Sequence, residues 1–104
     1  MTAYDLWLEP EVHQARKDLP GNVRQQIKRA IDHLTVDPRP SASIPVDVLK
    51  TDVPVAVEVR RLRRTPWRII YAVNDDEQWV WVLAIRRRPP YAYEDLDRLV
   101  ARLR

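Results

Sequence analysis

VPVAVEVRRLRRTPWRIIYAVNDDEQWVWVLAIR, residues 53–86, decides the fold of this chain. The stretch contains three runs that are rich in β-branched and aromatic residues, a composition typical of strands. They cover residues 53–62, 67–73 and 79–86. The segments between them, Arg64–Pro66 and Asn74–Glu77, are short enough to be hairpin turns. The stretch therefore predicts three consecutive antiparallel strands.

The part of the chain before this stretch is mostly helical in its pattern. After a short strand at Tyr4–Leu8, a first helix is expected to begin at Pro10, which suits the first helical turn, and to end near Asp18. A second helix is predicted after the N-cap Asn22. Its apolar residues form one stripe: Val23, Ile27, Ala30, Ile31 and Leu34. Residues 37–45, DPRPSASIP, are expected to be a loop.

A last helix is expected over residues 94–104, where leucines and a valine recur at helical spacing. The predicted order is β-α-α-β-β-β-α within a single domain, residues 1–104, since a chain of this length supports one hydrophobic core. We expect an α+β fold in which a twisted antiparallel β-sheet packs on an N-terminal helical hairpin and a C-terminal helix follows.

Composition excludes several classes of function. With no cysteine, the chain has no disulfide, thiolate metal site or thiol nucleophile. The single glycine, Gly21, rules out glycine-rich phosphate loops. No apolar run reaches the roughly 18 residues of a membrane span, and the N-terminus lacks the pattern of a signal peptide. His13 and His33 are interpreted as surface residues. We expect a cytoplasmic protein without metal, cofactor or membrane contact.

Positive charge is concentrated in the strands. The net charge is +3, yet residues 60–88 contain eight arginines and only three acidic residues, a local charge of +5. Such local basicity is typical of phosphate-binding surfaces. The alternative is a solvated face or a site for an acidic protein, with Arg60 and Arg64 paired to Glu58. Codon bias is an alternative explanation for the total of fifteen arginines, though not for their clustering.

The aromatic residues are interpreted mainly as structural. Trp7 and Tyr71 are expected in the core, and Trp67, Trp79 and Trp81 in the core and at its rim rather than as platforms for base stacking. The acidic run Asp75–Glu77 is interpreted as a solvated turn, because consecutive carboxylates do not easily converge on one metal ion.

Several phrases resemble the RelE/ParE superfamily of toxin–antitoxin toxins, and the likeness covers nearly the whole chain. VRRLRRTPWRIIYAV (59–73) resembles the family's central hairpin, in which a basic strand precedes a strand of the form Y-R-hydrophobic-hydrophobic-Y. VWVLAIRRRPPYAY (80–93) resembles the last strand, with its basic end followed by a tyrosine, and DVLK (47–50) resembles the entry into the sheet. The resemblance implies a cognate antitoxin as partner.

Members of this family either cut messenger RNA on the ribosome or inhibit DNA gyrase. In the RNA-cutting members, basic residues on the concave face of the sheet hold the scissile phosphate. The resemblance implies catalytic roles here for Arg61, Arg68 and Arg88, with Arg87 as the alternative to Arg88. It also implies a catalytic tyrosine, which is either Tyr91 or Tyr93. It implies further phosphate contacts by Lys50, Arg60, Arg63, Arg64, Arg86 and Arg87. The family's Gly-His or Gly-Lys before the final arginine is replaced by Arg86-Arg87, which leaves no histidine as a general acid.

RNA cleavage also needs a base, which arginine cannot supply because it stays protonated. The candidates are Tyr91, Tyr93, Asp47 and Glu58. Strand alternation places Arg61 and Arg63 on one face of the sheet and Arg60 and Arg64 on the other. If Val55, Val57 and Val59 face the helices, Arg61 and Arg63 do so too unless a bulge intervenes, and this question stays open.

The expected function is that of a toxin acting as a metal-independent, ribosome-dependent messenger RNA endonuclease (an mRNA interferase) that inhibits translation. The alternatives are a ParE-like, non-enzymatic inhibitor of DNA gyrase and a degenerate, inactive member of the family. Clustered arginines favour the endonuclease, and the missing histidine favours the gyrase inhibitor.

Overall fold

The computed structural model of the chain describes residues 3–46, 56–64 and 66–87. Its elements follow the predicted order, with one additional short strand. They are β1 (Asp5–Leu8), α1 (Pro10–Lys17), α2 (Gly21–His33), β2 (Ser43–Pro45), β3 (Val57–Arg64), β4 (Trp67–Asn74) and β5 (Trp79–Arg87). The predicted helix over 94–104 lies outside the described residues.

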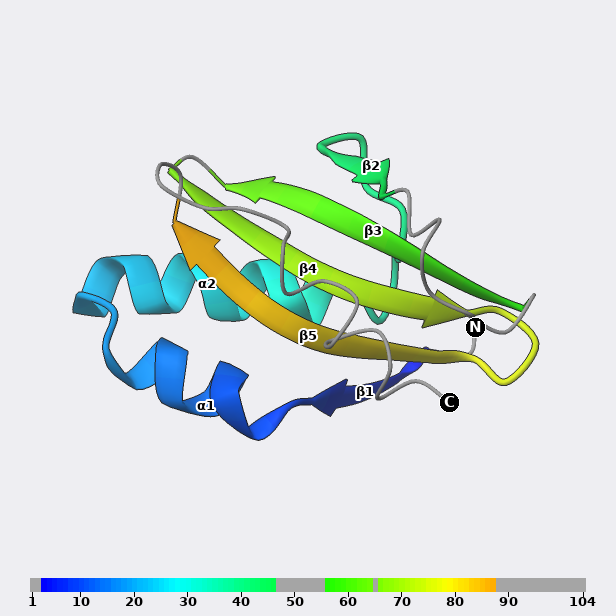
Figure 1. Cartoon of the computed structure of the whole chain (residues 1–104), viewed down its shortest axis with the longest axis horizontal. Coiled ribbons are helices and arrows are strands. Elements are labelled where there is room, and N and C mark those ends of the chain that lie inside the picture. Colours follow the sequence, from blue (N-terminus) through cyan, green and yellow to red (C-terminus); the bar gives the residue numbers. More distant parts are fainter. Residues whose placement is uncertain (1–2, 47–55, 65, 88–104) are drawn as a thin grey trace.

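The five strands form one sheet in the order β1-β5-β4-β3-β2 (Figure 1). The predicted meander of β3, β4 and β5 is confirmed, and both of its pairings are antiparallel. β2 extends the antiparallel part at one edge, whereas β1 joins the other edge parallel to β5. The α+β fold is as expected, and the parallel β1–β5 pair is a feature that the strand pattern did not specify.

Two local predictions are corrected. Residues 43–45 were expected to be loop but pair with β3 as a three-residue strand at the edge of the sheet. Pro45 is tolerated at the end of this edge strand, because its missing N–H costs no hydrogen bond of the ladder. Asn22 was expected as N-cap, yet α2 begins at Gly21 after Pro20. The Pro20 carbonyl accepts a hydrogen bond from the Arg24 backbone N–H at 2.8 Å, which closes the first helical turn one residue earlier.

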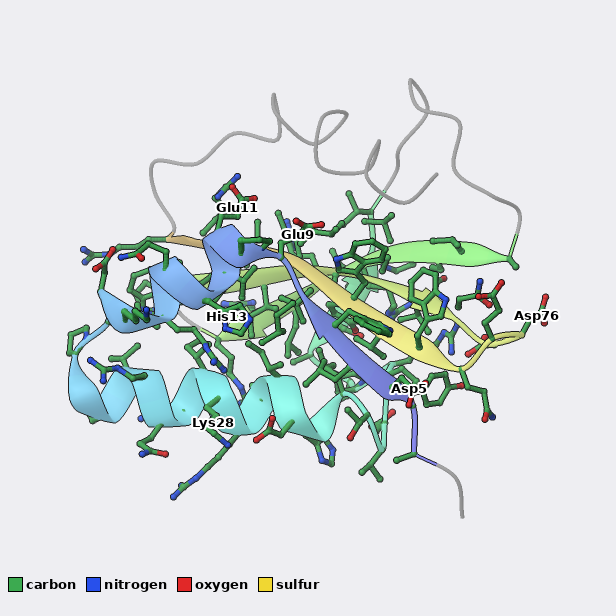
Figure 2. The ribbon with its side chains drawn as sticks, turned by 90° about the horizontal axis from the view of Figure 1, so that it is seen from below. Asp5, Glu9, Glu11, His13, Lys28 and Asp76 are labelled. Carbon is green, nitrogen blue, oxygen red and sulfur yellow. The ribbon has the colours of Figure 1, made fainter. Side chains whose placement is uncertain are left out.

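Both helices lie against the same face of the sheet, as Figures 1 and 2 show. We call this face the helix face and the opposite one the far face. The main core lies between the helices and the helix face, and its largest buried side chains include Ile27, Ile31, Leu34, Tyr71 and Val82. Tyr71 is fully buried there, as predicted. His13 and His33 are both exposed, also as predicted.

Candidate phosphate-binding site

The apolar clusters resolve which face each strand residue occupies. Val59 packs with Ile70, Ala72 and Leu83 in a second cluster on the far face, and Val57 packs against it. Leu62 belongs instead to the main core on the helix face. The valines of β3 therefore point away from the helices, and alternation along the strand places Arg61 and Arg63 with them on the far face.

Three arginines form a continuous row across the far face. Arg63 of β3 pairs in register with Arg68 of β4, and Arg68 pairs with Arg86 of β5. Residues paired in this way have Cβ atoms roughly 5 Å apart, and like charges placed directly opposite destabilise a sheet. Arg61 lies on the same face one pair further along β3, opposite Ile70. We call Arg63, Arg68 and Arg86 the arginine row.

A bulge in β5 completes this row. Ile70 pairs with Ala84, but its neighbour Tyr71 pairs with Val82, so Leu83 is an extra residue without a partner of its own in β4. Bulges of this kind redirect the side chains that follow them. Here the change of register turns Arg86 to the far face, beside Arg68.

Arg68, at the centre of the row, is 2 % exposed. Its Nη1 donates a hydrogen bond to the Trp67 backbone carbonyl at 3.0 Å. Its Nε is buried and has no hydrogen-bond partner among the described residues. A buried cationic group is costly unless an anion or acceptor satisfies it. The Arg68 side chain is therefore a candidate for holding an anion at the arginine row.

Arg60 is separated from the row, because it lies on the helix face and is 9 % exposed. Its guanidinium donates to the Ser43 Oγ at 2.9 Å and contacts Glu58 Oε1 at 3.1 Å. The interpretation of Arg60 as a partner of Glu58 is confirmed. Glu58 also contacts Arg39 at 3.0 Å. This carboxylate is therefore engaged on the face opposite the arginine row, which removes it as a base acting at the row.

Arg64 and Arg87 flank Trp67 at the end of the sheet. Arg64 pairs with Trp67 across β3 and β4, and Arg87 pairs with Trp67 across β4 and β5. The Arg87 guanidinium carbon lies 6.0 Å from the centre of the Trp67 ring, a cation–π contact. Trp67 packs against the main core, so these two exposed arginines belong to the helix-face side. The interpretation of Trp67 as a core and rim residue is confirmed.

The remaining candidates, Lys50, Asp47, Arg88, Tyr91 and Tyr93, lie outside the described residues. The structure thus brings Arg61, Arg63, Arg68 and Arg86 together and separates Arg60, Arg64 and Arg87 from them. The sequence indicated Arg86 as a phosphate contact but did not show that it shares a face with Arg68, since nothing in the strand's composition marks Leu83 as a bulge.

A second feature of the far face, a pocket lined by tryptophans, was not predicted from the sequence. Trp7, expected in the core, is 57 % exposed. It pairs in register with Trp81, and together with Glu77 and Trp79 these residues line a pocket of about 470 Å³. The prediction for Trp7 was wrong because β1 is an edge strand whose Leu6 and Leu8, rather than Trp7, pack against the core.

The part of the chain that the structure describes contains no cluster of histidine or carboxylate side chains that could hold a metal ion. Within the same residues, no helix has the length and apolar character needed to cross a membrane.

The comparisons with known structures show the fold of RelE toxins. The RelE of an archaeal RelE–RelB complex from Pyrococcus horikoshii OT3 superposes with a TM-score of 0.72 at 22% identity, covering 88% of this chain and 100% of that one. The RelBE2 complex of Mycobacterium tuberculosis gives 0.65 at 16% identity, covering 83% and 99%. A free mutant RelE toxin from E. coli gives 0.63 at 19% identity, covering 96% of each chain.

A family model identifies the chain more closely. Residues 8–89 match the ParE toxin of the type II toxin–antitoxin system parDE, which is most of the chain. The protein therefore belongs to the ParE toxin family and, with its RelE-like fold, to the RelE/ParE superfamily of toxins of type II toxin–antitoxin modules. No curated protein matches the chain significantly.

Proposed function

We propose that this toxin is a metal-independent endoribonuclease that cuts messenger RNA on the ribosome, with the arginine row as its phosphate-binding site. The observation that carries the proposal is the environment of Arg68. It is a nearly buried cation between Arg63 and Arg86, and its Nε lacks a partner among the described residues. Backbone phosphate is an anion that suits this cluster of guanidinium groups, of which Arg63 is the exposed member.

The arginine row supplies one part of the chemistry. Cleavage by the neighbouring 2′-hydroxyl develops negative charge on a five-coordinate phosphorus, and fixed guanidinium donors stabilise that charge. Arg68 is the residue proposed to contact the reacting phosphate, with Arg61, Arg63 and Arg86 around it. Proton transfer must come from another group, for which Tyr91 and Tyr93 remain the proposed residues, and Arg88 remains a proposed partner at the phosphate.

We further propose that a cognate antitoxin protein binds the chain. The solved structures with this fold include toxin–antitoxin complexes, such as those of Pyrococcus horikoshii and Mycobacterium tuberculosis. An arginine row also suits an acidic protein segment, so the antitoxin and the RNA would compete for the same surface.

The test is a primer-extension map of messenger RNA from a cell-free translation reaction. The wild-type protein is compared with Arg68→Gln and with Arg29→Gln, a control that removes the same charge from an exposed position on α2. We expect discrete cuts within translated codons, reduced about 100-fold or more in Arg68→Gln, and unchanged in Arg29→Gln. Thermal unfolding of both variants establishes that each is folded.

Inhibition of DNA gyrase is the second candidate, and the family match favours it, because the family model that matches the chain is that of ParE. Intact messages, together with loss of gyrase supercoiling in the presence of the same preparation, would overturn the nuclease proposal. If the protein neither cuts messenger RNA nor blocks gyrase supercoiling, it is a degenerate member of the family.

A further inference from the structure

The tryptophan pocket lies on the far face at the end opposite the arginine row. It is built from three neighbouring positions of the sheet: Trp7 on β1, and Trp79 and Trp81 on β5. The Trp79 and Trp81 rings meet edge to face, with centres 5.9 Å apart and planes at 75°. Trp7 adds a third indole, more than half exposed, beside Trp81. The pocket thus has aromatic walls that differ in orientation.

One carboxylate completes the lining. Glu77 precedes β5, and its Oε2 accepts a hydrogen bond from the Trp79 indole N–H at 3.1 Å. This bond keeps the carboxylate at the pocket, and a carboxylate has several further lone-pair positions with which to accept donors. Aromatic faces carry partial negative charge, so the walls and Glu77 favour the same kind of ligand, a cation.

The surroundings of the pocket are acidic as well. Asp5 pairs in register with Trp79, and Asp76 is exposed in the turn before β5. Figure 2 shows Asp5 and Asp76 at the same end of the sheet. At a Debye length of about 8 Å, several carboxylates near one pocket raise the local concentration of cations and repel phosphates. The two ends of the far face therefore have opposite charge.

We propose that this pocket binds the cationic side chain, arginine or lysine, of a partner polypeptide. The chain contains an internal example of the contact, since Arg87 already lies over Trp67. A purely apolar side chain would desolvate Glu77 without compensating it. A nucleobase would bring its phosphate towards Asp5 and Asp76. This protein-binding role goes beyond RNA cleavage and does not require it.

The test uses small probes and the NMR signals of the tryptophan indole N–H groups. We expect N-acetyl-arginine amide to shift the signals of Trp7, Trp79 and Trp81 saturably, with a dissociation constant in the millimolar range. N-acetyl-citrulline amide, which has nearly the same shape without the charge, should not do so. Trp67 lies on the helix-face side and serves as the internal control, with a signal that stays in place.

Two variants separate the charge of Glu77 from general acidity. Glu77→Gln keeps the side chain's shape and should weaken binding of the arginine probe about 2- to 5-fold, the range expected for an exposed ion pair. Asp76→Asn removes the same charge from the same turn without altering the pocket lining, and should weaken binding less than twofold.

Three results would overturn the proposal. Equal shifts with the citrulline probe would show a neutral pocket. Larger shifts of the same signals with adenosine monophosphate would show a base-stacking site. No shift of the three signals with either amino-acid probe, in a protein whose Trp67 signal reports an intact fold, would show that the pocket takes no such side chain.

Discussion

Arg68 and Arg86 are direct partners across β4 and β5, and a bulge of one residue brings them together. In an unbroken ladder Arg68 would face Ile85, and Arg86 would point to the helix face. Leu83 shifts the register by one, so that Ile85 packs in the main core while Arg86 joins the arginine row. The toxin therefore depends on a local irregularity to assemble three guanidinium groups on one face.

The like charges of the arginine row are expected to reduce stability. Replacing Arg68 by methionine keeps much of the side chain's length and removes a nearly buried charge flanked by like charges. We expect Arg68→Met to stabilise the fold by about 1 kcal/mol while abolishing the proposed RNA cleavage. Urea denaturation measures the first effect, and the cell-free translation reaction measures the second.

Arg39→Met is the matched control for this prediction. Arg39 contacts Asp75 at 2.7 Å and Glu58 at 3.0 Å, so its loss should destabilise the fold by up to about 1 kcal/mol. If Arg68→Met destabilised the protein as much as Arg39→Met, the row would not be under electrostatic strain.

Tyr71 is expected to hold the loop after α2 to the sheet. Its hydroxyl donates a hydrogen bond to the Pro38 carbonyl at 2.7 Å in a buried position. We expect Tyr71→Phe to lower the free energy of unfolding by about 1–2 kcal/mol, because the carbonyl loses its buried donor. Tyr4→Phe, which removes the exposed bond to Asp75, should cost less than about 0.5 kcal/mol. Chemical denaturation distinguishes the two, and equal losses would contradict a buried bond.

Burial also raises the pKa of Tyr71 above its ordinary value of 10.0. The folded state therefore holds this proton more tightly than the unfolded state does. The resulting stability is fully present below pH 10 and is lost as the pH rises through the raised pKa. Raising the pH from neutral to alkaline should therefore lower the free energy of unfolding of the wild-type protein more than that of Tyr71→Phe.

Stability in acid is expected to depend on Asp75. Hydrogen bonds from Arg39 and Tyr4 hold the pKa of this carboxyl below its ordinary value of 3.8. The contribution is present above pH 3.8 and is lost as the pH falls through the lowered pKa. Because the side chain is half exposed, it should amount to less than about 1 kcal/mol. Comparing urea midpoints of wild type and Asp75→Asn at pH 6 and pH 2 tests this, and a constant difference would contradict it.

The turn before β5 contains local strain at Gln78. Its φ of 57° is in the left-handed region, which glycine adopts without a steric penalty. We expect Gln78→Gly to change stability by about 0 to +1 kcal/mol, since relief of strain offsets the added freedom of the unfolded chain. Gln78→Val should cost about 1–2 kcal/mol.

Asp76→Gly is the control, because Asp76 has no positive φ and gains nothing from glycine. It should destabilise the protein by about 0.5 kcal/mol. Thermal unfolding ranks the three variants, and a Gln78→Gly protein less stable than Asp76→Gly would refute the assignment of strain.

Much of the fold follows from local patterns in the chain. The runs around Val59, Ile69 and Val82 favour strands, because β-branched residues fit a pleated, half-buried surface. The apolar residues of α2 recur at helical spacing, which predicts a helix that packs this stripe against a hydrophobic core. For these reasons the meander, the helical hairpin and the family resemblance could all be predicted from the sequence. Arg68 could be identified as a candidate from its place in the motif Trp67–Tyr71.

The sequence did not determine which face of the sheet each arginine occupies. Alternation relates Arg61 to Arg63 and Arg60 to Arg64, but it leaves open which pair faces the helices. Only the packing of Leu62 into the main core, rather than Val59, decides it. The side chains of β3 do not indicate which face the helical hairpin covers, because both faces of this strand present apolar residues.

Local sequence patterns therefore specify the helices and strands, their order and the concentration of arginines. Tertiary structure alone decided that Arg63, Arg68 and Arg86 form one row, that Arg60 is turned into a polar network, and that Trp7 is exposed beside Trp81. The physical reason is that strand and helix propensities act over a few residues. Register, bulges and edge position arise from pairing between strands that are distant in sequence.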